Sequence, residues 1–162
     1  MQFLTSLAAA ASLVSLASAR ISGIALPRTV KAGDNINAIV VTEGYIQSVQ
    51  DIAIAFGVAP AASAYPGTLS TLLGSFYLGP EQSNVPNNIT EPITIPESLV
   101  PGKYVIAASL FSLYGASSSP TVSNYNVTVN VGNETSTTYV RSQFYVGNSN
   151  STVCLGGYTR RI

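Results

Sequence analysis

The stretch Ser123-Asn-Tyr-Asn-Val-Thr-Val-Asn-Val131 carries the clearest structural pattern of this chain. Apolar side chains occupy every second position, and a β-strand points every second side chain toward the same face of its sheet. Polar side chains fill the positions between them, which predicts a strand with one face on a core and the other in water. The side chains expected to face the core are Tyr125, Val127, Val129 and Val131.

Similar alternation, or a short apolar run, predicts further strands on either side of this stretch. They are expected over residues 35–42, 50–58, 71–78, 88–95, 102–113 and 138–146. In the second of these, alternation assigns Ile52, Ile54, Phe56 and Val58 to the core. Pro92 interrupts the pattern of the fourth, which suits an edge strand. Gly and Pro clusters separate the runs and no long amphipathic helix intervenes, so we expect an all-β antiparallel sandwich.

The turn before residue 102 narrows the expected architecture. In Leu99-Val-Pro-Gly-Lys-Tyr104, a Pro-Gly turn leads into a strand that has Tyr near its start. Immunoglobulin-like and fibronectin-like sandwiches often place a Tyr there, with its hydroxyl bonded back to the preceding corner. The Cys pair and Trp of antibody domains do not accompany it, so the expectation is a general immunoglobulin/fibronectin-like sandwich.

The N-terminus carries the pattern of a cleaved export signal. An apolar run from Ser6 to Ala17 ends in the small-residue pattern Ala17-Ser18-Ala19. This pattern predicts cleavage between Ala19 and Arg20. The alternative is a membrane anchor, but the run is shorter than the roughly 20 residues that a bilayer requires. The remaining chain is expected to form a sandwich core over residues 20–138, and residues 139–162 a C-terminal strand or a mobile tail.

The composition excludes several partners. Only 9% of residues are charged, with 7 Lys+Arg balanced by 7 Asp+Glu, so neither nucleic acid nor an anionic membrane is an expected partner. Cys154 is the one cysteine, which leaves either a small apolar side chain or an intermolecular bridge or reactive thiol. Four Asn-X-Thr triplets are candidate N-glycosylation sites, at Asn88, Asn126, Asn133 and Asn150.

The sequence contains no pattern typical of an active site. Histidine is absent, which removes the commonest general base and zinc ligand. Glu81 and Glu91 flank one loop, but nothing in their spacing brings them together as a catalytic pair. We therefore expect no enzymatic activity, metal or cofactor. A glycan-binding platform remains an alternative, because four tyrosines lie near predicted turns: Tyr45, Tyr65, Tyr77 and Tyr114.

Several sequence blocks together resemble one known family. They are Arg20-Ile-Ser-Gly-Ile-Ala-Leu-Pro27, Thr29-Val-Lys-Ala-Gly-Asp34, Asp51-Ile-Ala-Ile-Ala-Phe-Gly57, Leu73-Gly-Ser-Phe-Tyr-Leu-Gly-Pro80, Ser109-Leu-Phe-Ser-Leu-Tyr-Gly-Ala116 and Ser123-Asn-Tyr-Asn-Val-Thr-Val129. In this order they resemble the necrosis-inducing secreted protein family of fungal effectors. The resemblance covers the signal and nearly the whole mature chain.

This resemblance implies a function that the composition does not. Members of the family are secreted effectors of plant-associated ascomycetes. They suppress pattern-triggered immunity by binding and inhibiting receptor-associated and receptor-like cytoplasmic kinases of the host, and in some plants they induce cell death. Such an activity implies action in the host cytoplasm, and no kinase-contact residues can be carried over. The alternative is an extracellular cell-wall or matrix sandwich module that binds glycan, because the start of the mature chain also resembles such domains.

Overall fold

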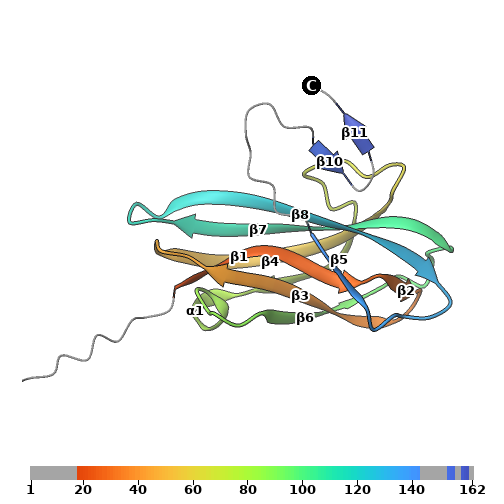
Figure 1. Cartoon of the computed structure of the whole chain (residues 1–162), viewed down its shortest axis with the longest axis horizontal. Helices are drawn as coiled ribbons and strands as arrows, with labels where there is room; N and C mark the ends of the chain where they lie inside the picture. Colours follow the sequence, from red (N-terminus) through yellow and green to blue (C-terminus); the bar gives the residue numbers. More distant parts are fainter. Residues whose placement is uncertain (1–17, 143–152, 156–157, 161–162) are drawn as a thin grey trace, which may run out of the picture.

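The computed structural model describes residues 18–142 and the backbone of two short strands, 153–155 and 158–160. Two sheets stack as layers to form an all-β sandwich, as the sequence predicts (Figure 1). The four-stranded sheet has the order β6-β3-β1-β9, and the five-stranded sheet has the order β2-β8-β7-β4-β5. A separate hairpin pairs β10 with β11.

The strands and the one short helix have the following bounds. They are β1 (Ala19–Pro27), β2 (Thr29–Lys31), β3 (Asn35–Gly44), β4 (Val49–Pro60), β5 (Thr71–Tyr77), α1 (Gly79–Gln82), β6 (Ile89–Thr94), β7 (Gly102–Tyr114), β8 (Ser119–Gly132), β9 (Tyr139–Arg141), β10 (Val153–Leu155) and β11 (Tyr158–Arg160). The pairs within the two large sheets are antiparallel except for the three-residue pairing of β2 with β8. Neither large sheet closes on itself, so each has two edges.

The core lies between the two sheets and is built largely from alternating side chains. The pattern in β8 is confirmed, because Val127, Val129 and Val131 are buried and Tyr125 packs against the core. Phe56 of β4 is fully buried and meets Phe76 of β5 edge-on, with 6.1 Å between the ring centroids. This geometry is favourable for aromatic pairs. The apolar faces expected from the sequence thus make one continuous core.

The first strand, β1, is not among those that alternation predicts. Every residue from Ile21 to Pro27 is buried, so both faces of β1 are covered. A strand covered on both faces has no polar face and loses the period of two. Gly23 permits the close packing, since a Cβ there would lie 2.6 Å from the Ser142 hydroxyl oxygen.

A β-bulge in β4 corrects one predicted core position. The register against β7 shifts between Asp51 and Ala53, which leaves Ile52 as the extra residue. Asp51 is therefore buried, whereas Ile52 is half-buried and lies outside the core cluster. The prediction that Ile52 faces the core together with Ile54 is wrong for this reason.

The tyrosine predicted to tie its hydroxyl to the preceding corner does not do so. Tyr104 is buried at the start of β7, but its hydroxyl makes no hydrogen bond within residues 18–142. A different tyrosine joins the two sheets: the hydroxyl of Tyr125 on β8 donates to the backbone carbonyl of Ile21 on β1, at 2.9 Å. The sandwich is present, but this detail of the immunoglobulin-like corner is absent.

The predicted C-terminal segment begins with β9, which pairs with the end of β1. Ser142 follows it and is buried, with its backbone N–H donating to the carbonyl of Ile24 at 2.8 Å. The remainder of the strand predicted up to residue 146 lies outside the described residues, as does the export signal up to residue 17. Of Cys154, only the backbone is described, in β10.

Candidate functional site

The two glutamates considered as a catalytic pair lie in different environments. Glu81 is exposed in α1, whereas Glu91 is buried on β6 between Ile89 and Ile93, so the pair shares no solvent-exposed surface. Within the described ranges, Glu91 Oε1 has no hydrogen-bond partner, and burial raises the pKa of its carboxyl group. The described part of the chain also contains no group of three or more metal-binding side chains.

Asp51 lies at the centre of a small polar cluster that the sequence does not reveal. Its side chain is 1% exposed, and its Oδ1 accepts a 2.6 Å hydrogen bond from the hydroxyl of Ser112. Burial raises the pKa of Asp51, while hydrogen bonds from Ser112 and the backbone of Asn84 partly offset that rise. The backbone N–H of Asp51 donates to the Ser83 hydroxyl at 2.7 Å. These contacts fasten the segment after α1 to β4 and β7.

The predicted cleavage site lies inside the folded part of the chain. Ala19 is buried at the start of β1, pairs with Gly44, and donates its backbone N–H to Asn84 Oδ1 at 2.7 Å. Arg20, the predicted mature N-terminus, pairs with Glu43. Cleavage between Ala19 and Arg20 would therefore start β1 at the Arg20–Glu43 pair.

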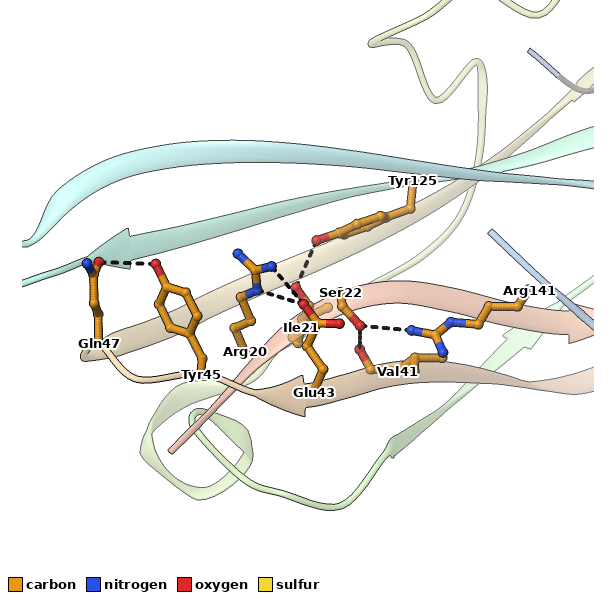
Figure 2. Close-up of polar contacts among 9 residues, drawn as sticks. All are labelled: Arg20, Ile21, Ser22, Val41, Glu43, Tyr45, Gln47, Tyr125 and Arg141. Atoms are coloured by element: carbon orange, nitrogen blue, oxygen red, sulfur yellow. Dashed lines mark hydrogen bonds and ion pairs between the residues drawn. The ribbon is translucent and has the colours of Figure 1, made fainter. Parts of the chain in front are cut away.

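Polar contacts surround the beginning of β1 (Figure 2). The guanidinium of Arg20 donates to Glu43 Oε1 from Nε at 2.9 Å and from Nη2 at 2.7 Å, and lies 4.7 Å from the ring centroid of Tyr45. The Tyr45 hydroxyl in turn donates to Gln47 at 3.1 Å. Both charged side chains are partly exposed, so we expect the ion pair to contribute at most about 1 kcal/mol.

The polar contacts continue along β1 toward β8 and β9 (Figure 2). The Ser22 hydroxyl accepts from Arg141 Nη2 at 3.0 Å and lies 3.4 Å from the carbonyl of Val41. Burial raises the pKa of Tyr125, whose hydroxyl binds Ile21, to about 12. Each of these contacts joins β1 to a neighbouring strand, which indicates a structural role for this region.

The candidate glycosylation sites occupy different parts of the fold. Asn88 is exposed just before β6, and its Oδ1 accepts from the backbone N–H of Thr42 at 3.0 Å. Asn126 is half-buried on β8, and Asn133 is exposed in the turn after it. Asn150 lies outside the described residues. The structure thus places one of the three described sites within a strand.

Among residues 18–142, no strand pairs with one side of β8 along most of its length. β7 pairs with one side of β8 from Ser119 to Val131, whereas β2 reaches only residues 130–132 on the other side. The backbone N–H of Asn130 donates to the carbonyl of Arg28, on the side away from β7. Backbone groups of every second residue point the same way in a strand.

The direction of the unpaired groups follows from this alternation. The pairing of β7 with β8 has no register shift, so the alternation set by Asn130 extends along the strand. Pro120 belongs to the same set of residues, whose backbone groups face away from β7. A proline is tolerated there because pairing with β7 requires no N–H from that position. Within residues 18–142, no strand pairs with the outward N–H and C=O groups of Val122, Asn124, Asn126 and Thr128. We call this segment the β8 edge.

A row of apolar side chains crosses the outer face of the same sheet. The register aligns Tyr77 of β5, Ala53 of β4, Phe111 of β7 and Val122 of β8. Tyr77 is 73% exposed, Val122 62% and Phe111 39%. We call this set the apolar row. It ends at the β8 edge, so backbone hydrogen-bonding groups and exposed apolar side chains lie next to each other.

Comparison with known proteins identifies the family. A model of the Nis1 family matches residues 17–130, which is most of the chain. The chain belongs to the Nis1 family. It is 98% identical over its full length to the necrosis-inducing secreted protein 1 of Colletotrichum orbiculare (strain 104-T), which it covers completely.

A second Nis1 relative is more distant but agrees. Over 143 residues the chain is 69% identical to the necrosis-inducing secreted protein 1 of Colletotrichum higginsianum, covering 88% of this chain and 99% of that protein. Both relatives are named as secreted proteins, which supports the prediction that this chain is exported. No helix in the described part of the chain is long and apolar enough to cross a membrane.

Solved structures resemble the Nis1 chain only weakly. A superoxide reductase (neelaredoxin) from Ignicoccus hospitalis aligns with a TM-score of 0.40 at 12% identity, over 71% of this chain and 80% of that one. A cellulose-active polysaccharide monooxygenase from M. thermophila aligns with a TM-score of 0.43 at 19% identity, over 71% and 57%. At such scores neither similarity bears on the chemistry of this protein.

Proposed function

We propose that this Nis1-family protein is a secreted effector that suppresses immune signalling in plants by binding and inhibiting host kinases. The targets are receptor-associated and receptor-like cytoplasmic kinases, and the action takes place in the host cytoplasm. Induction of host cell death belongs to the same proposal. The observation that carries it is the 98% identity, over the whole chain, to a protein named for inducing necrosis.

Inhibition by contact requires an accessible surface, and the described residues offer one. The β8 edge presents unpaired backbone groups, and the apolar row places Phe111 and Val122 beside it. Neutral side chains such as Ser109 and Asn124 occupy the next register row on this face. Protein interfaces commonly combine an apolar centre with neutral polar groups around it. These features support a binding role for the five-stranded sheet.

The test is recovery of kinases from plant extract by the tagged mature protein, Arg20 to Ile162. We expect receptor-like kinases in the bound fraction, and reduced autophosphorylation when the purified kinase is mixed with the protein. A heat-denatured sample of the same protein provides the control for non-specific capture. Recovery of no kinase from either membrane or cytosolic fractions would refute the proposal.

A matrix module that binds neutral polysaccharide is a second candidate, favoured by one observation. The ring of Tyr77 lies close to Gly79, where a Cβ would be 2.5 Å from the ring atom Cε1, and Tyr77 is nevertheless largely exposed. Phe111 lies two strands away in the same row, about 10 Å from Tyr77 at the usual strand spacing. Two rings so spaced suit successive disaccharide units of an extended glycan.

This second candidate has its own test. Binding to insoluble β-glucan or chitin should fall at least about tenfold in Y77A/F111A and stay unchanged in Y65A, because Tyr65 is equally exposed but lies in the loop after β4. If the unaltered protein does not sediment with either polysaccharide, this candidate is wrong.

A further inference from the structure

We propose that the β8 edge is the docking site for an extended segment of the partner kinase, which adds to the five-stranded sheet as a new strand next to β8. The inference rests on the proposed function and assigns it a surface. Strand addition is a general mode of peptide recognition, in which the backbone supplies affinity and alternate side chains supply specificity. It requires a regular, unobstructed strand edge.

The other edges of the sandwich are poorly suited to such an addition. In β6, Pro92 sits near the middle of a six-residue strand, opposite Asn37. β9 has only three residues, and the part of β1 before Ala25, which β9 does not reach, carries Arg20 and a register shift between Ile21 and Gly23. β5 has seven residues and pairs with β4 through a register shift at Phe56 and Gly57. Proline, bulges and short length are the usual means by which natural proteins protect sheet edges.

The β8 edge has none of these protections between Val122 and Thr128. Its pairing with β7 is regular, and this stretch contains no Pro, Gly or charged side chain. Within residues 18–142, four alternate residues have an outward backbone donor and acceptor that no strand pairs: Val122 and Asn124, which are exposed, and Asn126 and Thr128, which are half-buried. An added strand of about eight residues would therefore find a complete ladder of backbone partners.

The side chains along the edge define the chemistry of the segment that fits. A residue opposite Val122 would extend the apolar row from Tyr77 through Phe111, so an aromatic or β-branched side chain fits there. Opposite Asn124 and Asn126, small or polar uncharged side chains fit, because these positions carry amides. The expected partner segment is extended and uncharged, with an apolar residue at one end.

Charge also restricts the segment of the partner that fits. Among the side chains of β4, β5, β7 and β8 on the outer face of the sheet, that of Lys103 is the one with a charge. It lies at the far end of the sheet, opposite Asn130. A highly acidic or basic segment would find no counter-charge along the edge. A second copy of this chain or residues 143–162 could use the same backbone groups, and the experiment separates these occupants.

The first measurement is residue-resolved amide hydrogen exchange of the mature protein, with and without the kinase domain that the pull-down recovers. We expect the N–H groups of Val122, Asn124, Asn126 and Thr128 to become protected when the kinase binds. Those of Ser123 and Tyr125, which face β7, should change little because they are already paired. Protection of the β8 edge at high protein concentration without kinase would assign it to a second copy and overturn the inference.

The second measurement compares two variants at one position. Asn124→Pro removes the outward N–H, whereas Asn124→Ala removes only the side chain, whose Oδ1 accepts from Ser109 at 2.7 Å. We expect kinase affinity to fall by roughly tenfold or more in N124P and by less than about threefold in N124A. Circular dichroism and thermal unfolding of both variants check that the fold is retained.

The outcomes separate this inference from the function on which it rests. Kinase binding that N124P retains at full strength, with no new protection on β8, would overturn the docking site and leave the proposed function intact. Kinase-induced protection confined to residues 143–162 would do the same. If the unaltered protein binds no kinase, the proposed function and the docking site are both wrong.

Discussion

Two of the sheet edges, those of β6 and β8, differ in how they are protected against pairing with another chain. β6 is short, carries Pro92 near its middle, and turns the carboxyl group of Glu91 inward. The β8 edge is longer and regular, and its one proline, Pro120, lies at the start of the strand. Since an unprotected edge invites association, its retention in a secreted chain points to a use. The difference between these edges is the reason for proposing β8, and not β6, as the docking surface.

Proline should have very different effects on the two sides of β8. Ser123→Pro removes an N–H that faces Leu110 of β7 and should destabilise the protein by about 3 kcal/mol. Asn124→Pro removes an outward N–H and should cost about 1 kcal/mol, mostly from the lost contact with Ser109. Urea unfolding of both variants measures the difference. Equal destabilisation would contradict the assigned direction of the backbone groups.

How far the sequence predicts this fold depends on what covers each strand. β3, β6 and β8 alternate because one face is solvated, and the sequence identifies all three. β1 is covered on both faces and shows no alternation, and the bulge at Ile52 depends on how β4 meets β7. The candidate site is less predictable still. The sequence identifies Asn126 by its Asn-X-Thr triplet. The β8 edge, in contrast, exists because β2 is short, and only the strand pairing reveals this.

The next prediction concerns how the stability of the protein depends on pH, to which Glu91 on β6 contributes. Burial raises the folded-state pKa of Glu91 above its ordinary 4.5 and that of Asp51 above 3.8. The folded state then binds more protons than the unfolded state, so stability is highest at low pH and falls as pH rises through the raised values. We expect lower stability at pH 7 than at pH 4. The β8 edge contains no carboxyl group, so it should not contribute to the pH dependence of stability.

Glu91→Gln tests the assignment of that pH dependence. The variant should be more stable than the unaltered protein at pH 7, and its stability should vary less with pH, because a neutral amide replaces a carboxylate whose buried Oε1 has no partner in the described residues. Glu81→Gln is the matched control, since Glu81 is exposed and should leave the profile unchanged. An identical pH profile in E91Q would contradict this account.

A smaller effect separates two tyrosine hydroxyls that bind backbone carbonyls. Tyr125→Phe removes the partly buried bond from β8 to Ile21 and should cost about 1 kcal/mol. Tyr139→Phe removes an exposed 3.3 Å contact with Asn37 and should cost under about 0.5 kcal/mol. Thermal unfolding provides the measurement. A larger loss in Y139F than in Y125F would show that β8 is not tied to β1 as described.

Glycosylation offers the finest comparison, because candidate sites lie beside both edges. Asn88 directly precedes β6, whereas Asn126 lies on the β8 edge. A glycan on Asn126 should weaken kinase binding by blocking the added strand, and a glycan on Asn88 should have little effect. Binding by N126Q and N88Q proteins from a glycosylating host, each compared with the unaltered protein, measures this. Stronger binding only in N88Q would contradict the expectation.

Hydrogen exchange of the free protein can show whether the outward side of β8 is unpaired. NMR should show slow exchange for the N–H groups of Ser123, Tyr125 and Val127, which face β7, and fast exchange for those of Val122, Asn124 and Asn126. This alternation along one strand is the predicted result. Uniform protection from residue 122 to 128 would show that the edge is already occupied, and would contradict the account.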